Sequence, residues 1–150
     1  MKNLFDAATI DEVKARLEKL RPESERQWGK MAAAQAVAHC SAGFEMAAGT
    51  ITPPRMFLGR LIGRFVKPMA LGNDQPIPRN SSTLEGLAVN DERDLAKERV
   101  RLCGLIDRFA AVGPKGCTTH PHSFFGRLTP EEWAILMYKH LDHHLRQFGA

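Results

Sequence analysis

The chain has 150 residues, of which 43% are hydrophobic and 25% are charged, and its net charge is +4. This length and apolar content argue against global disorder and suit a single domain with one core over residues 1–150. The basic residues are spread along the chain rather than clustered, so we expect no nucleic-acid partner. Since no run of eighteen uncharged apolar residues occurs, we expect neither a membrane span nor a membrane partner.

Two features favour a cytoplasmic location. The first residues, MKNLFDAATIDEV, carry acids where an export signal needs an apolar segment. The cysteines are odd in number and contain no CxxC pair: Cys40, Cys103 and Cys117. We therefore expect reduced thiols and no disulfide framework.

The first predicted helix is short and spans residues 9–21. Thr9 and Glu12 have the spacing of a capping box. In this motif the side chain of each residue accepts a hydrogen bond from the backbone N–H group of the other. A second helix is predicted over residues 30–48. It is rich in alanine, which lets neighbouring helices approach closely, and it stops at Gly49, a common terminator.

A third helix is predicted over residues 54–70. Its apolar face consists of Phe57, Leu58, Leu61, Ile62, Phe65 and Met69. Its basic residues recur on another face and are Arg60, Arg64 and Lys67. These basic residues permit two interpretations, a strip for anionic lipids or phosphates and the solvated outer face of a bundle helix, and we favour the second. Gly59 and Gly63 indicate close packing against a neighbour.

The second half of the chain is predicted to hold two further helices. A long loop over residues 71–90 contains proline and glycine and shows no helical period. A helix over residues 91–112 follows, with acidic residues at its start. The last helix covers residues 129–147, and its TPEE start combines a threonine N-cap, a proline at the first position and a glutamate at the third. No strand-like alternation occurs, so we expect an all-α fold.

The last predicted helix carries a histidine pair suited to metal binding. His140 and His144 lie one helical turn apart, so both rings project from one face and form half of a metal site. His39, in the middle of the second predicted helix, is the candidate third ligand. His143 is interpreted as a neighbour of the ligands, although its spacing also permits binding. Gln147 is a candidate for orienting a ligand or water, or alternatively a hydrogen-bonding residue at the helix end.

One histidine on an early helix and an HxxxH pair on the last resemble the DinB/YfiT-like superfamily, and more closely a branch of unknown function. The matching stretches are WGKMAAAQAVAHC at 28–40, HSFFGRLTPEEW at 122–133 and YKHLDHHLRQFG at 138–149. The resemblance implies a four-helix bundle, here with an additional short N-terminal helix, and one metal bound by His39, His140 and His144. It also implies that His122 belongs to a loop over the site. The superfamily includes transferases and isomerases that use the thiol cofactors bacillithiol or mycothiol.

Three imidazole ligands leave one position of a zinc-like ion open to water or substrate, and a water bound there has its pKa lowered to ~7. Imidazole suits zinc, nickel, copper and iron alike, and we expect zinc or nickel. Two functions stay open. One is a metal-dependent thiol transferase or hydrolase that uses a low-molecular-weight thiol and a small-molecule substrate. The other is a non-catalytic bundle that holds a metal or small ligand. The sequence shows no second catalytic motif, and it is compatible with a homodimer.

Overall fold

The computed structural model describes the backbone of residues 1–150 and every side chain except that of Glu85. Over these residues the fold is all-helical and has no β-strand, only an isolated antiparallel bridge between His122 and Gly126. The α-helices are α1 (Ala7–Leu17), α2 (Ala33–Ala48), α3 (Phe57–Leu71), α4 (Leu95–Val112) and α5 (Pro130–Gln147). Two short 3-10 helices are η1 (Glu85–Leu87) and η2 (Gly113–Gly116). The expected all-α class is confirmed.

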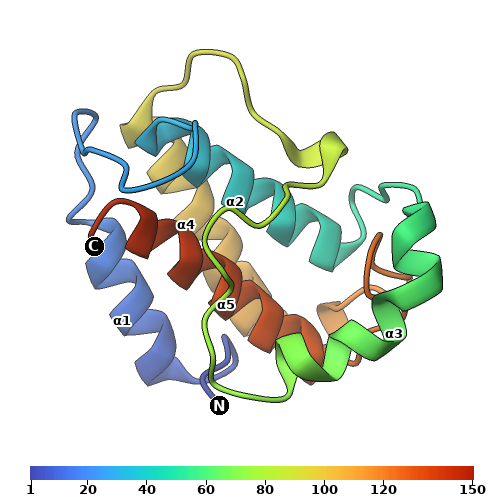
Figure 1. Ribbon diagram of the computed structural model, residues 1–150. Helices are drawn as coiled ribbons and strands as arrows, with labels where there is room; N and C mark the ends of the chain where they lie inside the picture. Colours follow the sequence, from blue (N-terminus) through green and yellow to red (C-terminus); the bar gives the residue numbers. More distant parts are fainter.

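The core forms where α2 packs along α4 and α5 and α1 closes the remaining side (Figure 1). Val13 and Leu17 of α1 are buried in this core, together with Trp133 and Leu141 of α5. By contrast, α3 lies at the edge of the molecule and packs mainly against α5 and the turn that precedes it. The short first helix is therefore part of the central helix packing, whereas α3 is peripheral.

Side-chain caps explain where several helices begin. In α5, the Thr129 hydroxyl accepts from Glu132 N at 3.1 Å and the Glu132 carboxylate accepts from Thr129 N at 2.8 Å, which confirms the predicted capping box. The expected cap of the first helix is wrong. Asp6 is the N-cap there, and its carboxylate accepts from both the backbone N–H and the hydroxyl of Thr9.

The other helix bounds differ from expectation by a few residues at their starts. The α4 helix begins at Leu95, because the Asp94 carboxylate accepts from Lys97 N at 3.1 Å. The α2 helix begins at Ala33, after the Gln35 side chain pairs with the N–H of Ala32 at 2.9 Å. The predicted stop at Gly49 is confirmed, since this residue has a φ of +77°, a conformation that glycine adopts without strain.

The orientation of α3 differs from that of a bundle helix with a buried apolar face, although Arg60 and Arg64 are exposed, as a solvated basic face requires. Its glycines, Gly59 and Gly63, are buried, whereas the large apolar side chains of its predicted apolar face are exposed. A Cβ atom at Gly63 would lie 2.0 Å from the carbonyl oxygen of Phe124, so only glycine permits this close approach. The two glycines thus serve internal packing, as expected.

Cys40, Cys103 and Cys117 are free thiols, as predicted. Within the described part of the chain, each helix is too short or too polar to cross a bilayer.

Candidate metal centre

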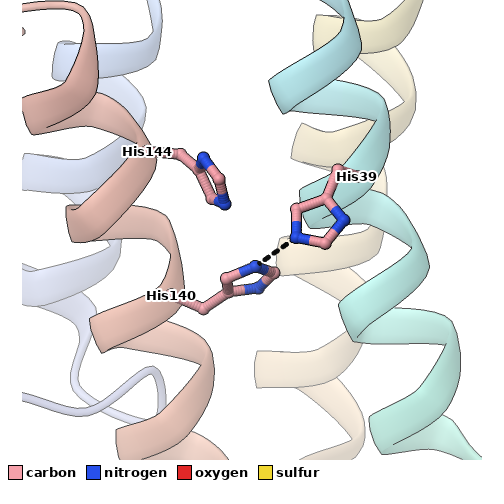
Figure 2. A group of neighbouring side chains, drawn as sticks. All are labelled: His39, His140 and His144. Carbon is pink, nitrogen blue, oxygen red and sulfur yellow. Dashed lines mark hydrogen bonds between the residues drawn. The ribbon is translucent and has the colours of Figure 1, made fainter. Parts of the chain in front are cut away.

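Three histidine rings from two helices meet between α2 and α5. His39 projects from α2, and His140 and His144 project towards it from α5 (Figure 2). One ring nitrogen from each lies within 4.8 Å of the others, and Nε2 of His39 is 2.8 Å from Nε2 of His140. Three nitrogens bound to one ion at 2.0–2.1 Å are about 3.3 Å apart in tetrahedral coordination. Small ring rotations would therefore bring these atoms into a metal coordination sphere.

The hydrogen bonds of His39 and His144 identify the nitrogen that each could offer. Nδ1 of His39 lies 2.7 Å from the carbonyl oxygen of Leu87, which can only accept, so Nδ1 carries the proton. Nδ1 of His144 lies 2.8 Å from Oε1 of Gln147 and donates to it. In both rings Nε2 therefore carries a lone pair, and that of His39 accepts a hydrogen bond from Nε2 of His140 at 2.8 Å. This arrangement, with one nitrogen donating and the other available, is the usual state of a histidine that binds a metal.

The orientation of Gln147 is itself fixed. Its amide nitrogen donates to the carbonyl oxygen of Trp28 at 2.7 Å, so its oxygen must face His144. The Gln147 side chain is buried, which excludes water as a substitute partner. The helix-end glutamine therefore connects the segment before α2 to a candidate ligand on α5.

His140 lies close to the backbone of α2 because Gly43 leaves room for its ring. A Cβ atom at this position would lie 3.0 Å from Nδ1 and 3.2 Å from Cε1 of His140. An alanine in place of Gly43 would therefore push the ring by a few tenths of an ångström. The sequence showed that this helix is rich in alanine and suited to close approach, but it did not single out Gly43.

Burial keeps the three rings neutral. It lowers the pKa of His39, lowers that of His144 to about 3, and holds that of His140 well below its ordinary value of 6.5. The proximity of the other imidazoles lowers the pKa of His140 and His144 further. Metal ligands must be deprotonated, so near neutral pH the site is in the form that binds an ion. His39 and His144 are buried and His140 is half-buried.

A family comparison shows to which group of proteins this arrangement belongs. A family model described as "Protein of unknown function (DUF1569)" matches residues 2–150. The chain belongs to this family. Neither the curated proteins nor the solved structures contain a match to it. The family description assigns no reaction to this DUF1569 protein.

The loop between α3 and α4 covers one side of the histidine cluster in this DUF1569 chain. It crosses in front of α5 in Figure 1 and bonds to His39 through the Leu87 carbonyl. Nδ1 of His143 lies 3.3 Å from the carbonyl oxygen of Ile77 in the same loop. The His143 ring also makes an edge contact with the His144 ring, with centroids 5.0 Å apart. His143 is thus a neighbour of the cluster and part of its contact with the loop.

Lys139 fixes the beginning of this loop, and sequence reasoning missed it. Its ammonium group donates to the carbonyl oxygens of Ala70 and Asn73, both at 2.6 Å, and of Gln75 at 3.0 Å. Burial lowers the pKa of Lys139. The only signal in the sequence was a lysine between the apolar run WAILMY and His140, which indicates an unusual environment without naming the partners.

The structure does not place His122 in contact with the three rings. Its Nδ1 accepts from the N–H groups of Phe124 and Phe125, both at 3.1 Å, and its ring packs near Trp133. Burial and the nearby Arg55 lower its pKa to about 4. His122 therefore stabilises the turn on which α3 rests, a role for which its position in the sequence gave no signal.

A separate cavity of about 120 Å³ lies beyond His143. It is lined by Trp28, Pro76, Ile77, Pro78, Arg79, His143 and Arg146. Of these residues only His143 touches the histidine cluster. The cavity is therefore beside the candidate metal centre and does not open directly onto its ligands.

Proposed function

We propose that this DUF1569 protein binds one divalent metal ion through His39, His140 and His144. The observation that carries the proposal is that one ring nitrogen from each of three histidines lies within 4.8 Å of the others. Two of these histidines, His39 and His140, are 101 positions apart in the sequence. Three imidazole nitrogens suit zinc or nickel. The proposal includes a DinB-like architecture and a single domain over residues 1–150, acting in the cytoplasm on a small molecule.

The residues around the rings would prepare the site in two ways. Leu87 and Gln147 hold the Nδ1 protons of His39 and His144, so the Nε2 lone pairs point to a common centre. The loop that bonds to His39 and His143 limits water on its side of the cluster. An ion bound by three imidazoles acts as a Lewis acid with an open position, at which water or a thiol loses its proton more readily.

This chemistry supports a metal-dependent thiol transferase or hydrolase with a low-molecular-weight thiol as cosubstrate. The second candidate is a non-catalytic protein that holds a metal or a small ligand. It is favoured by the composition of the cluster, which among the described residues contains three histidines and no carboxylate that could act as a general base. Activity in a thiol-conjugation screen that disappears on metal removal would distinguish the first candidate from the second.

The ligand set is tested by alanine substitution and measurement of bound metal. We expect His39→Ala, His140→Ala and His144→Ala each to lose most of the metal, because two imidazoles bind an ion much more weakly than three. His120→Ala is the matched control, since His120 is exposed and does not belong to the histidine cluster. Full metal retention in His39→Ala would remove His39 from the ligand set. If the unmodified protein, prepared under metal-replete conditions, contains no bound metal, the proposed site is rejected.

A further inference from the structure

The α3 helix presents a continuous apolar face to the outside. The exposed fractions of its large apolar side chains lie between 39% and 77%. These residues are Phe57, Leu58, Leu61, Ile62, Phe65 and Met69. Isolated apolar residues are common on protein surfaces, but an apolar face along a whole helix marks a contact site.

The glycine side of α3 is anchored, so the apolar face cannot turn towards the core. Gly59 and Gly63 lie against the backbone of Phe124. The Arg55 guanidinium donates to a carbonyl group of the same turn at 3.0 Å, and Lys67 forms an ion pair with Glu132 of α5 at 2.9 Å. The exposure of the apolar face is therefore built into the fold.

Unpaired basic residues lie along one edge of this face. Arg60 and Arg64 are exposed and one helical turn apart, and the Arg64 guanidinium lies 4.5 Å from the ring centroid of Phe65. Neither arginine forms an ion pair with any side chain that the structure describes. The segment 46–73 contains four basic residues and no acidic residue. A partner for this surface should accordingly combine apolar material with negative charge.

A second copy of the chain does not meet this requirement. Two α3 helices packed antiparallel across a two-fold axis would bring Arg60 and Arg64 of one copy beside the same residues of the other. Because the segment has no acidic residue, nothing in it would compensate this repulsion. The helix also lies on the outside edge of the molecule (Figure 1), which suits a flat surface better than a peptide bound in a groove.

We propose that α3 is a docking surface for an anionic lipid bilayer. The apolar face would enter the boundary between headgroups and acyl chains, with the helix in the plane of the membrane, and Arg60 and Arg64 would bind lipid phosphates. Such a peripheral contact requires no membrane span. The sequence left a basic strip for anionic lipids as the less favoured interpretation of this helix, whereas the orientation of its apolar face is visible only in the structure. The proposal is independent of the metal site.

Flotation of the full chain with vesicles tests this surface. We expect the unmodified protein to float with vesicles of phosphatidylglycerol and phosphatidylcholine, and much less with phosphatidylcholine alone. Replacing Arg60 and Arg64 together by glutamine should lower partitioning roughly 25-fold, at about fivefold for each basic residue. Arg108→Gln is the matched control, because Arg108 is exposed on α4.

The apolar contribution has its own pair of variants. Phe65→Ser with Met69→Ser should lower partitioning at least tenfold, whereas Val100→Ser with Val112→Ser, at exposed positions of α4, should leave it unchanged. All four positions are exposed, so circular dichroism should show folded protein in each case.

Three results would overturn the proposal. One is unmodified protein that does not float with anionic vesicles. Another is equal binding to the neutral vesicles. The third is a solution dimer that dissociates on Phe65→Ser with Met69→Ser, since the face would then be covered by a second copy.

Discussion

Replacing Gln147 by alanine removes the one side chain that holds His144 in its ligand orientation. The Gln147 oxygen accepts from Nδ1 of His144 at 2.8 Å, and its amide nitrogen donates to the Trp28 carbonyl at 2.7 Å. Alanine makes neither bond, so the His144 ring becomes free to rotate or to change its tautomer. The three ring nitrogens would then no longer be preorganised around one centre.

The expected loss of metal affinity is 10–100-fold, the usual cost of removing the partner that orients a histidine ligand, or about 1.4–2.7 kcal/mol. A second cost falls on folding. The Trp28 carbonyl loses its donor in a partly buried position, which should lower the free energy of unfolding of the metal-free protein by about 0.5–1.5 kcal/mol.

Gln147→Glu separates these two effects. A carboxyl group still accepts from Nδ1 of His144, so we expect metal affinity within about tenfold of the unmodified protein. When ionised, the carboxylate cannot donate to Trp28, so the loss of stability should remain. Gln35→Ala, at the start of α2, removes an amide whose hydrogen bonds involve Ala32 and Asp91 rather than a histidine.

Metal affinity would be measured by competition with a chromophoric chelator at fixed pH, and stability by urea denaturation with the metal removed. We expect the order unmodified protein, Gln147→Glu, Gln147→Ala for affinity, with Gln35→Ala equal to the unmodified protein. Affinity of Gln147→Ala within twofold of the unmodified protein would refute the assigned role of Gln147 as the group that orients His144.

Two further predictions concern the turn beneath α3. Gly63→Ala should destabilise the protein by about 1–3 kcal/mol in urea denaturation, because the added Cβ would overlap the Phe124 carbonyl. Gly104→Ala is the control. Open space surrounds Gly104, so this variant should be neutral or stabilising. The pKa of His122 is about 4 in the folded protein, below its ordinary value of 6.5. Between these two pH values the unfolded chain binds a proton at His122 that the folded protein does not bind. The free energy of unfolding therefore falls as the pH drops from 6.5 to 4, by up to about 1.4 kcal/mol per pH unit from this residue. Asparagine can still accept from the N–H groups of the turn but does not titrate, so His122→Asn should lose the contribution of one proton to the pH dependence of the unfolding free energy. An unchanged pH dependence would contradict the conclusion that His122 is neutral in the folded protein.

Local sequence patterns were sufficient for the helices and for half of the site. Helical periodicity and the Thr129 cap depend on residues within one or two turns, so the start of α5 follows from the sequence alone. The pairing of His140 with His144 is likewise local, because a spacing of four places both rings on one face. The position of His39 beside them is a tertiary fact. Its place in the middle of the second predicted helix made it a candidate, and the resemblance to a family of bundles then implied the same ligand.

The sequence marked Gly59 and Gly63 of α3 as packing positions, but only the tertiary structure showed that the apolar face is left exposed. Periodicity shows that Phe65 and Arg64 belong to different faces, but it contains no information on which face finds a partner. Here the backbone of Phe124 approaches so closely that only the glycine edge of the helix fits against it, and the apolar face is left outside. Burial of apolar area, which usually sets the orientation of an amphipathic helix, is overridden at this position by a close backbone contact.

The partners that tune the candidate metal centre are also long-range. The Leu87 carbonyl that sets the tautomer of His39, the Trp28 carbonyl that orients Gln147 and the three carbonyls bound by Lys139 are all backbone atoms. Every residue carries such a carbonyl, so no residue type in the sequence marks the ones that are used. The sequence therefore determined which side chains could bind a metal, and only the folded backbone determined how their protons, rings and surroundings are arranged.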